Sequence, residues 1–228
     1  MKFFVTGTDT DSGKTLAASA ILVAVNNYAR KQNKAISTLG IKPIASGCEQ
    51  TEKGLRNSDA LSLISAMNSE VEYQTVNPIR FEPAIAPHIA AKQVGFDLTA
   101  DKVEAVFRQI PQADFTLIEG AGGWRLPLND NEYLSQVVAK QKLPVILVIG
   151  MKLGCLNHAM LTHESILAYG LEIVGWVANH VDPDMLQKQE NLAFLKQTIK
   201  APFLGEIPFL EDATADVAAK SLDVSVLV

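Results

Sequence analysis

Short apolar segments alternate with longer amphipathic segments along most of this chain. The apolar runs contain many Val, Ile and Leu residues and do not alternate with polar ones, which is typical of strands covered on both faces of a parallel sheet. We predict strands at residues 2–6, 35–42, 114–119, 144–149 and 171–178, and a short strand just before Gly205.

Helical periodicity fills the intervals between these predicted strands. Val103, Val106, Phe107 and Ile110 follow the i, i+3, i+4, i+7 spacing of an amphipathic helix that ends before Pro111. We also predict helices at residues 14–30, from about 59, at 156–169 and at 185–199, a polar loop at 46–57 and a mostly irregular segment at 77–87. Alternating strands and helices predict a doubly wound α/β fold of the P-loop NTPase type, with a mostly parallel sheet and helices on both faces. Because no composition shift marks a linker, we expect residues 1–228 to form a single domain.

Composition and charge exclude several classes of partner. Apolar residues make up 48% of the 228 residues and charged residues 20%, which is an ordinary globular balance. The net charge is −5 and no basic block occurs, so we expect no nucleic-acid partner. The longest apolar run, residues 143–151, is too short to cross a bilayer, and we expect no signal peptide. Two isolated thiols, Cys48 and Cys155, suit a reducing cytoplasm.

The glycine-containing loop after the first predicted strand is the main candidate site. The phosphate-loop pattern G-x-x-x-x-G-K-[ST] ends correctly at Gly13, Lys14 and Thr15, but Thr8 occupies its first glycine position and Gly7 comes one residue early. A strand precedes the loop and a helix follows, so helix N–H groups can hold an anion, Lys14 can reach outer phosphates and Thr15 can ligate Mg²⁺. The alternative is a plain capped glycine turn.

Four residues outside this loop could complete such a site. Glu119 ends an apolar strand before several glycines and suits a metal-directed acid, although an acid is also ordinary at a strand end. Asp59 could be a second metal acid or simply a helix N-cap. Lys42 has apolar neighbours, which favour a buried, functional cation over a solvated one. Ser46 could donate a hydrogen bond or belong to a turn.

Several motifs together resemble the dethiobiotin synthetase family. The segments GTDT-x-x-GKT, IKPIASG, GLRNSDAL, NPIRFEPAIAPHIAA, EGAGGW, LPVILVIGMKLGCLNHAMLT, GWVAN and GEIP occur in this order between residues 4 and 210. The first is shared with many ATPases, whereas KLGC-x-NHA and GLRNSDA are far more specific. The extra residue in the phosphate loop is also found in the loop pattern of this family.

The resemblance implies a cytoplasmic, homodimeric ligase of biotin biosynthesis that uses ATP and Mg²⁺. Its substrates are diaminopelargonic acid and CO₂ or bicarbonate, which form a carbamate that ATP phosphorylates before the second amine closes the ureido ring. Such a reaction depends on positioning and charge stabilisation rather than on a protein nucleophile. The chain accordingly shows no nucleophile motif.

The resemblance also implies site residues. Lys42 and Lys14 would be catalytic, with Thr15, Asp59 and Glu119 around Mg²⁺. The nucleotide would contact Asp11, Ser12, Gly13, Lys14, Thr15, Leu16, Asp59, Glu119, Gly120, Ala121, Gly122, Asn179, His180, Pro208, Phe209 and Leu210. The substrate would contact Ser46, Leu153, Gly154, Cys155 and Asn157, the last four across a dimer interface.

Four positions depart from the family pattern. Asp11-Ser12 replaces the usual Glu-Val, Asn191 stands where some relatives have an aromatic residue, and His180 stands where an acid is common.

Three other functions compete with this one. A partitioning-type regulatory ATPase is the main alternative, but Asp9 occupies the position of its signature lysine here. Amide-forming synthetases with a glutaminase domain are longer. A non-catalytic binding module is permitted by the fold alone.

Overall fold

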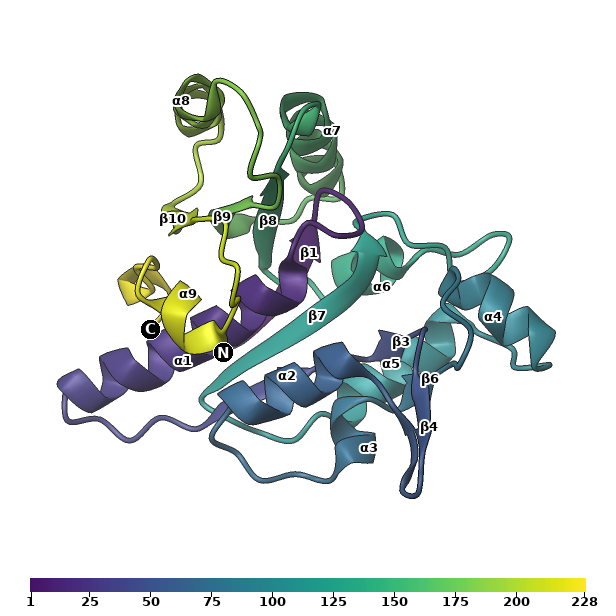
Figure 1. Cartoon of the computed structure of the whole chain (residues 1–228). Coiled ribbons are helices and arrows are strands. Elements are labelled where there is room, and N and C mark those ends of the chain that lie inside the picture. Colours follow the sequence, from purple (N-terminus) through teal and green to yellow (C-terminus); the bar gives the residue numbers. More distant parts are fainter.

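A six-stranded parallel sheet forms the centre of the molecule (Figure 1). The structure is a computed structural model and describes residues 1–228. The strand order is β10-β9-β8-β1-β7-β2, and every pairing is parallel. Because β1 lies between β7 and β8, the loop that follows it opens at the middle of the carboxyl edge of the sheet. The bounds are β1 Lys2–Gly7, β2 Thr38–Ile41, β7 Phe115–Gly123, β8 Val145–Met151, β9 Ile173–His180 and β10 Phe203–Ile207.

Both faces of this sheet are covered by helices, as β8 shows. Val145, Leu147 and Ile149 belong to one hydrophobic cluster, whereas Ile146 and Val148 belong to the cluster on the other face. All five side chains are fully buried. Since successive side chains of a strand point to opposite faces, a strand with two covered faces needs an uninterrupted apolar run.

The helices divide between the two clusters and confirm the predicted fold class. Buried residues of α1 (Lys14–Lys31), α2 (Ser58–Ala66) and α9 (Ala215–Ala219) join one cluster. The other cluster receives residues from α4 (Pro87–Gln93), α5 (Ala100–Gln109), α6 (Leu134–Lys140), α7 (Cys155–Ala168) and α8 (Lys188–Thr198). The remaining helical segments are α3 (Tyr73–Val76) and a 3₁₀ turn at Ser225–Leu227. No helix combines the length and apolar character needed to cross a membrane.

Two predicted loops contain more structure than the sequence pattern suggested. Residues 46–57 include an antiparallel hairpin of β4 (Glu49–Thr51) and β5 (Gly54–Arg56), whose three-residue strands are too short to show a periodicity. The Pro-rich segment is mostly irregular as predicted, but β6 (Ile79–Arg80) within it pairs with β3 (Ile44–Ala45).

Helix and strand boundaries also needed correction. Helix α4 was missed because its first residue is Pro87, whose fixed φ suits the first position of a helix even though proline breaks helix interiors. Helix α8 begins at Lys188, later than predicted, because Gln187 before it adopts a left-handed φ of 52°. Strand β7 does not end at Glu119 but continues to Gly123, and the short strand β10 includes Gly205–Ile207 rather than stopping before them.

Candidate functional site

The loop between β1 and α1 has the backbone of an anion-binding turn. Asp11 and Gly13 both adopt left-handed conformations, with φ of 59° and 76°. A Cβ atom at Gly13 would collide with the side-chain nitrogen of Asn179, so glycine is required there by both conformation and space. The same Asn179 nitrogen donates to the Ser12 carbonyl at 3.0 Å, which ties the loop to the end of β9.

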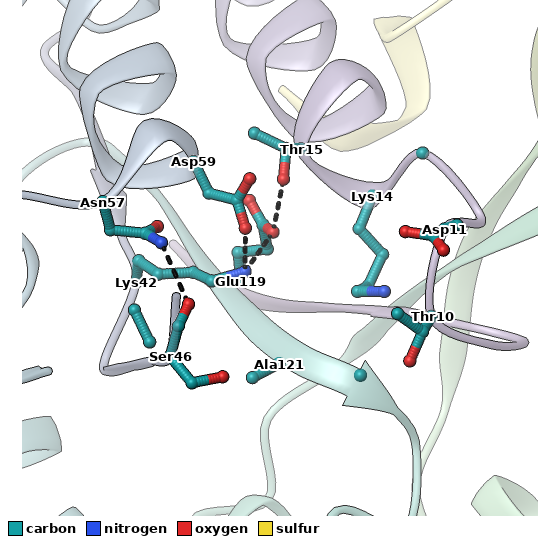
Figure 2. A pocket seen from close by; sticks show the side chains of 13 residues that line it. Thr10, Asp11, Lys14, Thr15, Lys42, Ser46, Asn57, Asp59, Glu119 and Ala121 are labelled. Carbon is teal, nitrogen blue, oxygen red and sulfur yellow. Dashed lines mark hydrogen bonds and ion pairs between the residues drawn. The ribbon is translucent and has the colours of Figure 1, made fainter. Parts of the chain in front are cut away.

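A cavity of about 400 Å³ lies in front of this loop (Figure 2). It is formed by residues from the phosphate loop, the ends of β2 and β3, the start of α2 and β7. The lining residues are Thr10, Asp11, Gly13, Lys14, Thr15, Lys42, Ala45, Ser46, Asn57, Asp59, Glu119, Ala121 and Gly122.

Lys42 is buried at the base of this cavity and is held by two carboxylates. Its Nζ lies 2.6 Å from Glu119 Oε1 and 2.8 Å from Asp59 Oδ2, and it donates to the Gly120 carbonyl at 3.1 Å. Only 3% of the Lys42 side chain is exposed, so the solvated alternative is wrong. Burial opposes its charge, but Glu119 and Asp59 outweigh that cost and raise the pKa of Lys42. Lys42 therefore stays protonated at neutral pH.

Asp59 is not the cap of α2, which settles the alternative that the sequence left open. The cap is Asn57, whose Oδ1 accepts the Ala60 N–H at 3.3 Å. Asp59 lies in the first turn of α2, and its carboxylate points toward Lys42 (Figure 2). Although burial would raise the pKa of Asp59, the Lys42 ammonium lowers it below its usual value.

Lys14 carries a charge that the surrounding protein compensates only in part. Its side chain is 7% exposed and donates to the Asp9 carbonyl at 3.0 Å. Burial, with the nearby charge of Lys42, lowers the pKa of Lys14 to about 8. An anion bound in front of Lys14 would reverse this shift, because it favours the protonated ammonium.

The acid at position 9 has a cationic partner outside the loop. Asp9 Oδ2 lies 3.1 Å from Lys152 Nζ, in the turn after β8, and 3.9 Å from His158 Nδ1. Burial would raise the pKa of Asp9, but Lys152 lowers it. The acid therefore links the loop to the turn before α7, an arrangement that loop spacing alone did not explain.

Thr15, Asp59 and Glu119 form an oxygen-rich corner that suits Mg²⁺. The Thr15 hydroxyl donates to Glu119 Oε1 at 2.8 Å, and the buried Glu119 Oε2 has no hydrogen-bond partner. No group of three or more His, Cys, Asp or Glu side chains is arranged so that it could hold a metal ion. Two carboxylates and a hydroxyl are nevertheless enough for Mg²⁺ bound with a nucleotide, since phosphates and waters supply its other ligands.

The other predicted residues lie outside the cavity. Ser12, Leu16 and Gly120 belong to the same elements but do not line it. Asn179 and His180 end β9, where His180 Nε2 lies 2.7 Å from Glu206 Oε1. Pro208, Phe209 and Leu210 follow β10, and Leu153, Gly154, Cys155 and Asn157 lie at the start of α7. The buried Cys155 side chain points into the core, whereas Leu153 is 93% exposed.

Sequence reasoning missed three lining residues, Thr10, Ala45 and Asn57. Nothing in the residue type of Thr10 or Ala45 distinguishes them as binding residues; only their position beside predicted site residues could have indicated them. Asn57 had one, because asparagine is among the preferred N-cap residues and here precedes the first residue of α2.

Comparisons with known proteins agree with this geometry. A family model described as AAA domain matches residues 1–217. The ATP-dependent dethiobiotin synthetase BioD of Cellvibrio japonicus is 53% identical over 99% of this chain and 96% of its own length. The protein of the same name from Pseudomonas aeruginosa strain LESB58 is 50% identical over 97% of this chain and 95% of its own.

Solved structures support the fold at lower identity. The MinC:MinD cell division protein complex of Aquifex aeolicus has a TM-score of 0.54 at 16% identity, covering 98% of this chain and 87% of that chain. A ParA family ATPase from Chlorobium tepidum also has a TM-score of 0.54 at 16% identity, covering 99% and 91%.

The parallel sheet and the glycine loop before α1 define a nucleotide-binding α/β protein of the P-loop NTPase class. Relatives that share about half of their residues with this chain, over almost the full length of both proteins, identify the family within this class. The chain belongs to the ATP-dependent dethiobiotin synthetase family.

Proposed function

We propose that this chain synthesises dethiobiotin from diaminopelargonic acid, CO₂ and ATP. The observation that carries the proposal is the buried Lys42, which Glu119 and Asp59 hold inside the same cavity as Lys14 and Thr15 of the phosphate loop. A second cation beside the triphosphate site suits a reaction in which a negatively charged carbamate receives a phosphoryl group. The names of relatives at about half identity support the same reaction.

The proposed reaction has three steps. One amine of the diamine attacks CO₂ and loses a proton, which gives a carbamate. A carbamate oxygen then attacks the γ-phosphorus of ATP and expels ADP, which leaves a carbamic–phosphoric anhydride. The second amine attacks the anhydride carbon, phosphate departs with the C–O bonding pair, and loss of a proton leaves the cyclic urea.

The chain would contribute charge and position rather than a covalent intermediate. Lys14 would neutralise the outer phosphates, and Lys42 would face the carbamate and the transferred group. Ser46, which lines the same cavity, would hold the substrate. Thr15, Asp59 and Glu119 would hold Mg²⁺, which neutralises phosphate charge when it is bound with the nucleotide.

We extend the proposal to the residues outside the cavity. Asn179, His180 and the segment 208–210 would contact the adenine. Support comes from the hydrogen bond between Asn179 and the Ser12 carbonyl of the loop, and from the place of 208–210 directly after β10, the strand that pairs with β9. The residues at the start of α7 would hold the substrate carboxylate from the neighbouring copy of a homodimer. Support comes from the exposure of Leu153, which no part of its own chain covers.

We also propose that the chain works as a single domain in the cytoplasm. Residues from both halves of the sequence share one sheet, in which β1 lies between β7 and β8. Both cysteines are free thiols in buried positions, which suits a reducing compartment.

The decisive experiment is an assay with purified protein, the diamine, bicarbonate and MgATP. Dethiobiotin would be measured by mass spectrometry and ADP by a coupled enzyme. We expect equal amounts of both products, and ADP formation should require the diamine and bicarbonate together. ATP hydrolysis at the same rate without the diamine would instead identify a regulatory ATPase.

A further inference from the structure

The main chain of Lys42 is held by a buried asparagine outside the cavity. Lys42 follows the last residue of β2, and its N–H donates to the Val76 carbonyl at 2.8 Å. Its carbonyl accepts the side-chain nitrogen of Asn77 at 2.7 Å. Asn77 is fully buried, so this hydrogen bond has no competition from water.

A tyrosine continues this connection to α2. The Tyr73 hydroxyl donates to Asn77 Oδ1 at 3.1 Å and accepts the Asn57 N–H at 2.8 Å. Burial raises the pKa of Tyr73, so the hydroxyl keeps the proton that it donates. One hydroxyl group therefore joins the segment that holds Lys42 to the residue that caps α2.

Asn57 links the same connection to two further groups of the site. Its Oδ1 caps α2, the helix that carries Asp59, and its Nδ2 donates to the Ser46 carbonyl at 3.4 Å. Asp59 in turn holds the Lys42 ammonium at 2.8 Å. Lys42 is thus fixed at its main chain through Asn77 and at its side chain through α2, and Tyr73 joins the two.

We propose that Tyr73 and Asn77 are positioning residues for the reaction, which set Lys42 relative to Asp59 without touching the substrate. Neither residue lines the cavity. The proposal rests on the proposed function, because it assumes that Lys42 acts on the carbamate and the transferred phosphoryl group. A ring-closing reaction that depends on placement is sensitive to a small shift of such a cation.

The cleanest test is Tyr73→Phe, which removes one hydroxyl and keeps the ring. The ring stays packed beside Arg56 and Arg80, whose guanidinium carbons lie 4.1 Å and 5.6 Å from its centre. Asn77→Asp is the second variant, because it removes the donor to the Lys42 carbonyl at nearly constant volume. Tyr28→Phe is the matched control, since Tyr28 is a half-buried tyrosine on α1.

We expect kcat to fall about tenfold or more in Tyr73→Phe and in Asn77→Asp, while KM for ATP changes less than about threefold. The KM for ATP should hold because Tyr73, Asn77 and Asn57 form no side-chain hydrogen bond with the phosphate loop. The kcat of the double variant should be no lower than that of the less active single variant, because both substitutions interrupt one chain of hydrogen bonds. The control should match the wild type.

Amide hydrogen exchange gives a second measurement that does not need activity. In Tyr73→Phe the Asn57 and Lys42 amides should exchange about tenfold faster or more, with β8 unchanged. Normal kcat per folded molecule in both variants would overturn the proposal, even if the unfolding temperature fell. A wild type that makes no dethiobiotin would refute the proposed function instead, and unchanged exchange would then still overturn the positioning role.

Discussion

At the scale of single residues, the site is organised around one buried ammonium. Lys42 is stable in the interior only because Glu119 and Asp59 surround it, and removal of one partner from a buried ion pair usually destabilises a protein. The same carboxylates are the proposed ligands of Mg²⁺. Lys42 therefore shares its partners with the metal, and nucleotide binding should redistribute charge within this group.

Lys42→Met should separate catalysis from nucleotide binding. We expect kcat to fall about a hundredfold or more, because a positive charge near the transferred group is lost. The Kd for MgATP, measured by isothermal titration calorimetry, should change less than about threefold because Lys14 and the loop amides remain. Lys140→Met is the control, since Lys140 pairs with Glu104 on the far helices α5 and α6. A kcat within twofold of the wild type, roughly the scatter of such assays, would remove Lys42 from the reaction.

At the scale of elements, a side chain just before β7 fixes the neighbouring edge strand. Asp114 Oδ2 accepts the Ser37 N–H at 2.8 Å and the Ser37 hydroxyl at 2.7 Å, just before β2 begins. These hydrogen bonds lower the pKa of Asp114. Because Lys42 directly follows the other end of β2, this contact helps to set the register of the strand that positions the site.

The lowered pKa of Asp114 makes its contribution to stability dependent on pH. A carboxyl group with a depressed pKa in the folded state stabilises above its unfolded pKa of about 3.9, and the contribution disappears as the pH falls through the folded value. We expect wild type to be more stable than Asp114→Asn at about pH 6 and the difference to shrink toward about pH 3. Urea unfolding at several pH values measures this. A constant difference between the two proteins would contradict the assignment.

At the scale of the whole molecule, the exposed apolar side chains of α7 suggest a contact between two copies. Leu161 is 59% exposed and Leu167 is 49% exposed on this helix, and Leu153 precedes it. Exposed apolar groups gathered on one helix are typical of interaction surfaces. The turn before α7 also carries the proposed substrate contacts, so a dimer through this side would complete the site.

Leu161→Asp should therefore disrupt the dimer. We expect wild type to sediment at twice the mass of one chain and the variant mostly at the mass of one, because a charge buried in an interface is left without a partner. Val226→Asp near the carboxyl end is the control, since Val226 is 60% exposed outside α7. If both variants remain dimeric, the interface lies elsewhere.

Local patterns were sufficient for much of this protein. Apolar segments predicted the strands of the sheet because both of its faces are covered, although the ends of β7 and β10 needed correction. The loop ending in Gly13, Lys14 and Thr15 predicted an anion-binding site. Segments too short for a period were missed, such as the hairpin at Glu49–Arg56. Helix α4 was missed because proline at a first helical position reads as a break.

The partners of each charged group depended on the folded chain. Lys42 and Glu119 are 77 positions apart, and Asp9 and Lys152 are 143 apart, so no spacing could pair them. They meet because parallel strands end at one edge of the sheet. Whether Asp59 would cap α2 or face Lys42 was likewise undecided until Asn57 was found in the cap. Secondary structure follows from neighbours in sequence, whereas ion pairs and buried networks follow from neighbours in space.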